Sequence, residues 1–182
     1  NRYQHNYIYD IARALVKEQG KALKDANLEV FTTFARESIF ADIEQTLTRI
    51  GIQFDNYFNE RSLYENGLID RVVDDLRDKG LVYEQEGATW FRSTEFGQEQ
   101  DRVIIKQSGE PTYRLPDIAY HREKFARGFD WMINVFGADH IATVPDVLAG
   151  VQALGLTADH ITVVMYQFVT LLRGGKQVKM ST

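Results

Sequence analysis

Hydrophobic residues recur at three- and four-residue intervals through most of the first eighty positions. This spacing places apolar side chains on one face of a helix, and it is the main sequence signal of an amphipathic helix. Gly20, Gly51 and Gly80 each follow a periodic segment, as expected for residues that end helices. The pattern therefore predicts helices over about residues 7–19, 31–50 and 68–79, with their apolar stripes packed in a core.

The residues after the third helix change to short strand-like runs. Residues 81–85 and 88–92 flank Glu86-Gly87, which predicts a β-hairpin. A helix followed by a hairpin is also typical of winged-helix nucleic-acid modules. However, residues 68–79 contain four aspartates, whose negative charge would repel DNA phosphates. We therefore reject a DNA-binding function as the main interpretation.

From about residue 103 the pattern alternates between strands and helices. Strands that are buried on both faces and separated by helices indicate a parallel sheet. Two or three such strands are too few for a complete doubly wound domain, so we expect half of one. The predicted elements are a strand at 103–105, an extended segment at 112–115, a helix opened by Pro116 and ending near 126, a strand at 131–136, a helix at 138–154 and a strand at 161–166.

Composition narrows the class of protein without naming a function. The 182 residues are 44% hydrophobic and 12% aromatic, which is enough for a real core. The net charge of −5 argues against a general polyanion-binding surface. The absence of cysteine excludes disulfides and thiolate zinc sites. We find no apolar run of about 18 residues and no signal peptide, so we expect a soluble cytoplasmic protein without a membrane partner.

Three polar groups fall where ligands bind in open α/β sheets, beyond the carboxyl ends of strands. They are Tyr113 with Asp117, the segment 137–140, and a glycine-rich exit at 173–177 that leads to Lys179. Each group has a simpler interpretation. The aspartates could cap helices, the histidines could be hydrogen-bonded helix residues, and the glycines could form a turn. No pair of histidines has the spacing of metal ligands, so no metal site is predicted.

Together these residues resemble the arginyl-tRNA synthetases. The most specific stretch is residues 112–140 (TYRLPDIAYHREKFARGFDWMINVFGADH). Residues 62–65 (SLYE) and 90–97 (WFRSTEFG) resemble the middle region of this family. Residues 179–182 (KMST) resemble its form of the second signature loop of class I synthetases. The resemblance covers almost the whole chain.

The resemblance implies an enzyme that activates L-arginine with ATP and Mg²⁺ to arginyl-adenylate and then esterifies tRNA(Arg), with no tightly bound cofactor. Residues 1–105 would be a mainly helical insertion with a hairpin, and residues 106–182 the second half of a Rossmann-like catalytic domain. The chain contains no His-Ile-Gly-His-like element, no first half of the nucleotide fold and no anticodon-binding domain. We therefore expect the chain alone to be inactive.

The resemblance also assigns individual residues. Tyr113 and Asp117 would belong to the arginine pocket, where a carboxylate can accept two hydrogen bonds from the planar guanidinium. Asp139 and His140 would surround the bound amino acid. Lys179 and Ser181 would act in catalysis by approaching the ATP phosphates as pyrophosphate leaves. The implied ATP-binding residues are Gly137, Gln167, Phe168, Val169, Lys179, Met180 and Ser181.

The sequence departs from the class I pattern at one position, and two alternative functions remain open. Thr182 stands where many class I synthetases have a second lysine, and Lys176 is a candidate to compensate. One alternative is a non-catalytic helical binding module derived from a synthetase. The other is a different class I synthetase or a related nucleotidyltransferase, but a neutral or acidic amino acid gives no reason for a carboxylate such as Asp117 in its pocket.

Overall fold

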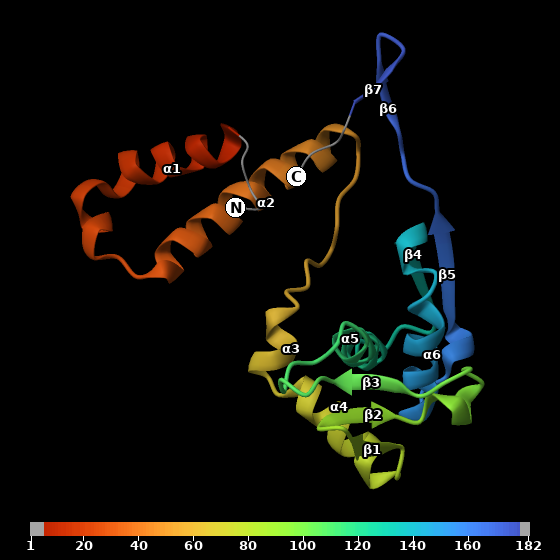
Figure 1. Ribbon diagram of the computed structural model, residues 1–182. Coiled ribbons are helices and arrows are strands. Elements are labelled where there is room, and N and C mark those ends of the chain that lie inside the picture. The colour runs from red at the N-terminus through yellow and green to blue at the C-terminus, as the bar shows by residue number, and fades with distance from the viewer. Residues whose placement is uncertain (1–5, 179–182) are drawn as a thin grey trace. The chain divides into compact units, whose positions relative to one another are not determined.

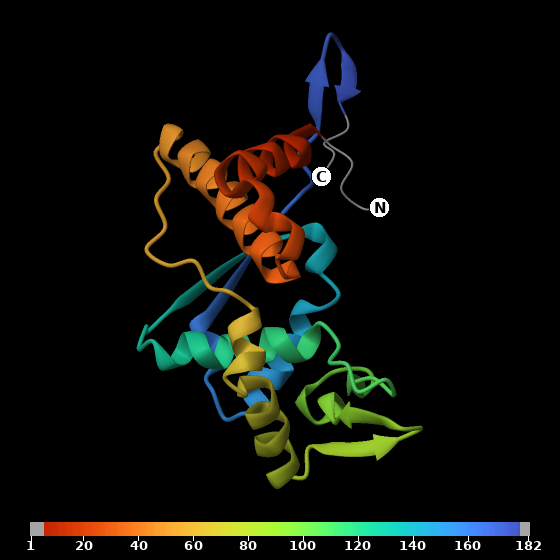
Figure 2. The same ribbon diagram turned by 90° about the vertical axis from the view of Figure 1, so that its left-hand side faces the viewer.

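The structure, a computed structural model, describes residues 6–178 (Figures 1 and 2). Within these residues the chain forms two compact units. One unit contains the described parts of Asn1–Tyr57 and Leu171–Thr182, and the other is Phe58–Thr170. No helix among the described residues is long and apolar enough to cross a membrane.

The first unit contains a helical hairpin and a β-hairpin. The side chain of Asn27 begins the second helix by accepting a hydrogen bond from the backbone N–H of Val30 at 3.2 Å. The two helices lie side by side (Figures 1 and 2), and both were predicted from the periodicity. The elements are α1 (Asn6–Gln19), the 3₁₀ helix η1 (Gly20–Asp25), α2 (Leu28–Arg49), β6 (Leu171–Arg173) and β7 (Lys176–Val178).

The apolar stripe of α2 is only partly covered. No residue of α2 is buried, and Phe31 and Ile43 are exposed, whereas Leu15 of α1 is buried. The prediction that this stripe packs in a core is therefore wrong for the described residues. The physical reason is that a helical hairpin gives each helix a single neighbour, which covers less than the width of a stripe this broad.

The second unit begins with two helices and an antiparallel sheet. Glu86 and Gly87 have φ values of 53° and 74°, so they form the two-residue turn that the sequence predicts. The strand predicted at 103–105 belongs to this antiparallel sheet, beside β2, and not to the parallel sheet. The elements are α3 (Arg61–Glu65), α4 (Leu68–Asp78), β1 (Val82–Gln85), β2 (Ala88–Phe91), the 3₁₀ helix η2 (Ser93–Phe96) and β3 (Arg102–Ile105).

The rest of the second unit is a pair of parallel strands covered by two helices. The pairing runs from Met132 opposite Ile161 to Gly137 opposite Tyr166, which confirms the predicted parallel arrangement. Figure 1 shows α5 and α6 beside this sheet. The elements are α5 (Arg114–Ala126), β4 (Met132–Gly137), the 3₁₀ helix η3 (Ala138–His140), α6 (Val144–Ala153), the 3₁₀ helix η4 (Ala158–His160) and β5 (Ile161–Tyr166).

Prolines explain where the helix boundaries differ from the prediction. The extended segment predicted at 112–115 is wrong because α5 already begins at Arg114. Pro116 lies in its first turn, where a missing N–H costs no helical hydrogen bond. The single helix predicted at 138–154 is also wrong. Pro145 could not continue a helix from the preceding turn, so the chain forms η3 and then begins α6 at Val144.

A buried ion pair network and a close helix contact hold the second unit together. Asp146 is only 1% exposed and accepts hydrogen bonds from Arg102 of β3 at 2.9 Å and from Arg114 of α5 at 2.7 Å. Gly150 of α6 lies against Ile118 of α5 so closely that a Cβ atom there would collide with the Ile118 side chain. These contacts fix the first turn of α5 relative to β3 and α6.

The parallel strands are buried on one face only. Met132 and Asn134 are buried, whereas Ile133 and Val135 are 66% and 62% exposed. The prediction that both faces are buried is therefore wrong for residues 6–178. The mostly apolar sequence of β4 gave no information about which residues would cover its second face.

Candidate functional site

The carboxyl ends of β4 and β5 lie at the same edge of the sheet, because the two strands are parallel. The 3₁₀ helix η3 follows β4, and residues 167–170 follow β5. Gly137 ends β4, and a Cβ atom there would lie 2.5 Å from Asp139 Oδ1. The sequence therefore folds so that polar residues collect at the sheet edge where ligands bind in α/β proteins.

Asp117 is the most unusual charged group near this edge. It lies in the first turn of α5 and is partly buried. Burial raises the pKa of its carboxyl group, His140 and Lys124 oppose this effect, and the negative charge of Glu60 reinforces it. Among residues 6–178, no hydrogen bond or ion pair reaches the carboxylate of Asp117.

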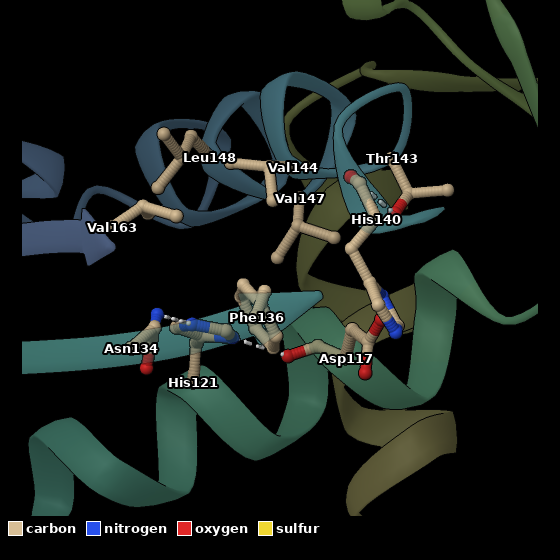
Figure 3. Close-up of a pocket in the computed structure, with 10 residues that line it drawn as sticks. All are labelled: Asp117, His121, Asn134, Phe136, His140, Thr143, Val144, Val147, Leu148 and Val163. Carbon is tan, nitrogen blue, oxygen red and sulfur yellow. Dashed lines mark hydrogen bonds between the residues drawn. The ribbon is translucent and has the colours of Figure 1, made fainter. Parts of the chain in front are cut away.

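Asp117 lines two neighbouring cavities. The first has a volume of about 10 Å³, close to the space of one water molecule. Figure 3 shows the side chains of Asp117 and His140 next to each other at one end of its lining. The second has a volume of about 180 Å³. Its lining brings a second carboxylate and two aromatic rings to Asp117. The residues that line it are Phe58, Glu60, Leu63, Pro116, Asp117 and Tyr120.

His121 and Asn134, which line the smaller cavity (Figure 3), belong to a chain of hydrogen bonds that begins at Lys124. Lys124 Nζ donates to Asn134 Oδ1 at 2.7 Å, and Asn134 Nδ2 lies 2.8 Å from His121 Nε2. His121 Nδ1 lies 2.7 Å from the backbone oxygen of Asp117. Burial, together with the positive charge of Lys124, lowers the pKa of His121 to about 4. The imidazole is therefore neutral, and the expectation that it is a hydrogen-bonded helix residue is confirmed.

The predicted residues that follow β4 differ in their placement. His140 lines the smaller cavity with Asp117, and its ring stacks on Phe136 with centroids 5.1 Å apart. Asp139 is exposed, and its Oδ2 lies 4.0 Å from His140 Nε2. Neither cavity is lined by Asp139.

The other predicted residues lie away from both cavities or outside the described part. Tyr113 is 90% exposed and lines neither cavity, although it directly precedes α5. The exposed residues Gln167, Phe168 and Val169 follow β5 at the sheet edge. The remaining predicted residues, Lys179, Met180 and Ser181, lie outside the described residues.

Sequence reasoning missed Glu60, Phe58 and Asn134. Glu60 and Phe58 precede the short helix α3, and they reach Asp117 only because α3 packs on α5. Asn134 was hidden in a strand of otherwise apolar residues, where a single polar residue with period-two spacing was the available signal. Within residues 6–178, no group of three or more histidine, aspartate or glutamate side chains is placed to hold a metal ion.

Comparison with known proteins gives one consistent result. The family whose sequence profile matches residues 3–182 is described as class I tRNA synthetases (R), catalytic domain. The chain is 67% identical over 181 residues to the arginine–tRNA ligase of Desulfotalea psychrophila and 53% identical to that of Salinibacter ruber. The alignments cover 99% of this chain but only 33% and 32% of those proteins, so the chain spans about a third of the length of these relatives.

Solved structures agree with the sequence relatives. A crystal structure described as an arginyl-tRNA synthetase from Campylobacter jejuni matches with a TM-score of 0.85 and 33% identity, over 99% of this chain and 40% of that one. The arginyl-tRNA synthetase of Thermus thermophilus matches with a TM-score of 0.67 and 16% identity, over 96% of this chain and 37% of that one. The second match concerns the fold alone.

Proposed function

Because the chain belongs to the arginyl-tRNA synthetases of class I, we propose that it is part of an enzyme that activates L-arginine with ATP and transfers it to tRNA(Arg). The whole enzyme is then an ATP-dependent ligase, and Mg²⁺ arrives with the ATP. Residues 106–182 form the second half of a Rossmann-like catalytic domain, and residues 1–105 form its insertion. The parallel pair β4–β5 and its covering helices lie within residues 106–182 and support a Rossmann-like half there. The compact unit Phe58–Thr170 crosses the boundary at residue 105, so the structural units do not follow this division.

The observation that carries the proposal is the carboxylate of Asp117, which has no hydrogen bond or ion pair within residues 6–178. A partly buried carboxylate without a cationic partner among the described residues is costly, since ionised groups are poorly solvated by protein interiors. A bound cation relieves that cost. Glu60 lines the same cavity and adds a second negative charge, so the cavity attracts a cationic ligand.

The shape and chemistry of this cavity suit a guanidinium group. A planar cation with five N–H donors is well matched by two carboxylates that accept in its plane. The rings of Phe58 and Tyr120 stack with centroids 4.4 Å apart and line the same cavity. The Arg127 guanidinium already lies 5.5 Å from each ring centroid, so this ring pair accepts a cation of that type. We assign the arginine side chain to this cavity, between Asp117 and Glu60.

The ATP site lies at the sheet edge formed by β4 and β5. Gly137 lets the backbone come close to Asp139, and Gln167, Phe168 and Val169 follow the neighbouring strand, where they line the adenine pocket. His140 and Asp139 then stand between the amino acid and the nucleotide. Because Tyr113 lines neither cavity, we propose that it contacts the part of the arginine that extends beyond the larger cavity.

The chemical step joins the two sites. The α-carboxylate of arginine attacks the α-phosphorus of ATP, and pyrophosphate leaves. Lys179 supplies a positive charge and Ser181 a hydroxyl to the phosphates, and Met180 lies between them in the sequence. Stabilisation of charge that develops in the transition state is the expected contribution of such a loop. Thus Asp117 and Glu60 select the amino acid, and Lys179 and Ser181 assist the departure of pyrophosphate.

The proposal is tested by arginine-dependent ATP–pyrophosphate exchange in the full-length protein that contains this chain. Asp117→Asn removes the charge facing the guanidinium, which should cost roughly 2–5 kcal/mol and appear mainly as a raised KM for arginine. Glu60→Gln should act in the same direction. Glu65→Gln, at an exposed carboxylate of α3, is the matched control and should leave the KM for arginine and kcat unchanged.

Two outcomes would contradict the proposal. If ATP–pyrophosphate exchange is as fast with other amino acids as with arginine, the assignment of arginine as the substrate is wrong. Wild-type values of KM and kcat in Asp117→Asn would remove the assigned residue. The isolated 182-residue chain should show no exchange, and clear turnover by it would refute the view that residues outside this chain complete the site.

A further inference from the structure

We propose that Lys124, Asn134 and His121 form a positioning relay that holds Asp117 in the orientation required for the arginine side chain. This inference rests on the proposed function of Asp117. None of the three residues is assigned to contact a substrate. They act through the backbone of α5, at the turn from which the Asp117 side chain projects (Figure 3).

The relay has one consistent pattern of donors and acceptors. Lys124 can only donate, so Asn134 must turn its Oδ1 atom towards the ammonium group. This places Asn134 Nδ2 against His121 Nε2, which must then accept. The ring proton is therefore on Nδ1, where it is donated to the backbone oxygen of Asp117. One lysine thus fixes the amide, the tautomer and the direction of the final hydrogen bond.

The relay also joins the two elements that carry the site. His121 and Lys124 belong to α5, which bears Asp117, whereas Asn134 belongs to β4, which leads to His140. Among residues 6–178, these are the only side-chain hydrogen bonds between α5 and β4. Apolar contacts are not directional, so they tolerate small movements of one element relative to another. Hydrogen bonds weaken when such movements change their length or angle. The relay therefore sets the separation between Asp117 and His140.

The placement of polar groups here favours positioning over stability alone. His121 is 3% exposed and Asn134 is 7% exposed. An apolar side chain at either position would avoid the cost of removing polar atoms from water. Every hydrogen-bonding atom of the imidazole is paired, so the arrangement has a single geometry. A carboxylate that selects a substrate needs such a single geometry in the residues that hold it.

The test is steady-state ATP–pyrophosphate exchange in the full-length enzyme. His121→Leu places an apolar side chain at this buried position and removes both hydrogen bonds of the imidazole ring. We expect it to raise the KM for arginine roughly ten- to a hundredfold, as for a small misplacement of a binding group, and to leave the KM for ATP unchanged. Asn134→Leu breaks both hydrogen bonds of the amide without changing the charge near Asp117. It should raise the KM for arginine in the same direction and tests the relay if His121→Leu folds poorly. His121→Gln can still accept from Asn134 and should recover most of the loss.

A stability control separates positioning from folding. Val72→Ala removes buried volume from α4, which carries none of the relay residues, and should lower the Tm without changing the KM for arginine. If His121→Leu and Asn134→Leu lower the Tm, as Val72→Ala does, but leave the KM for arginine unchanged, the relay has only a structural role and the inference is overturned. If the wild-type enzyme shows no arginine-dependent exchange, the proposed function fails instead.

Discussion

Lowering the pH from about 7.5 to about 5 should remove about 2 kcal/mol of folding free energy through His121 alone. Burial, reinforced by Lys124, lowers the pKa of this imidazole from 6.5 to about 4. The unfolded chain therefore binds a proton below pH 6.5, whereas the folded chain does not until about pH 4. The stability is fully present above pH 6.5 and is lost as the pH falls through 6.5 towards 4. Each pH unit in that window is worth about 1.4 kcal/mol, so the 1.5 units down to pH 5 give about 2 kcal/mol.

The assay compares wild type with His121→Leu by urea unfolding at both pH values. Other side chains titrate in this window, but they are common to both proteins, so the difference in free energy of unfolding isolates His121. That difference should shrink by about 2 kcal/mol on going to pH 5. His160→Leu, at an exposed histidine, controls for the loss of an imidazole as such. A difference that is equal at both pH values, or an NMR titration of His121 near 6.5 in the folded chain, would refute the reasoning.

Four further substitutions test the packing and the site. Gly150→Ala should destabilise the fold by about 1–3 kcal/mol in urea unfolding, because its Cβ would collide with Ile118; unchanged stability would mean that α5 and α6 lie further apart. Asp146→Asn should cost about 3–5 kcal/mol in the same measurement, since it leaves two arginines without their buried carboxylate, and a cost below about 1 kcal/mol would contradict that role. Glu86→Asn should stabilise the hairpin by about 0.5–1 kcal/mol because asparagine tolerates positive φ better than glutamate; a lower Tm would count against the turn. Asp117→Asn should leave the Tm at pH 7 unchanged or raise it. Because the pKa of Asp117 is raised in the folded chain, the stability that this group contributes below pH 3.8 is lost as the pH rises through its folded pKa. A clear fall in Tm would mean that the carboxylate has a structural partner.

The elements that the sequence predicted well are those with a strong local pattern. The helices α1, α2 and α4 follow three- and four-residue periodicity, and the β1–β2 hairpin follows Glu86-Gly87. The pairing of a short apolar strand is not a local property. Residues 103–105 could join either sheet, and only the tertiary fold places Ile105 opposite Thr89. The break before α6 was not predicted, although Pro145 was an available signal, because proline disfavours the continuation of a helix from the preceding turn.

The residues of the candidate site also fall into those with a local sequence signal and those without one. Asp117 and His140 could be selected because each follows or begins an element at a strand end, and the structure brings them to one cavity. Glu60 carries no such signal, because it precedes a short helix and reaches Asp117 only through packing of α3 on α5. The hydrogen bonds of His121 could not be predicted either, since its partner Asn134 lies on another element.

The exposed outer face of the parallel strands has a practical consequence for work with this chain. Ile133 and Val135 of β4 and Val164 of β5 present neighbouring apolar side chains on that face. The outer edges of β4 and β5 have no neighbouring strand within residues 6–178. An apolar face bordered by such edges is a template on which identical molecules associate. Light scattering of the 182-residue chain should therefore rise steeply with concentration, and Ile133→Lys should suppress the rise. Spectroscopy on the isolated chain calls for dilute samples or for that substitution.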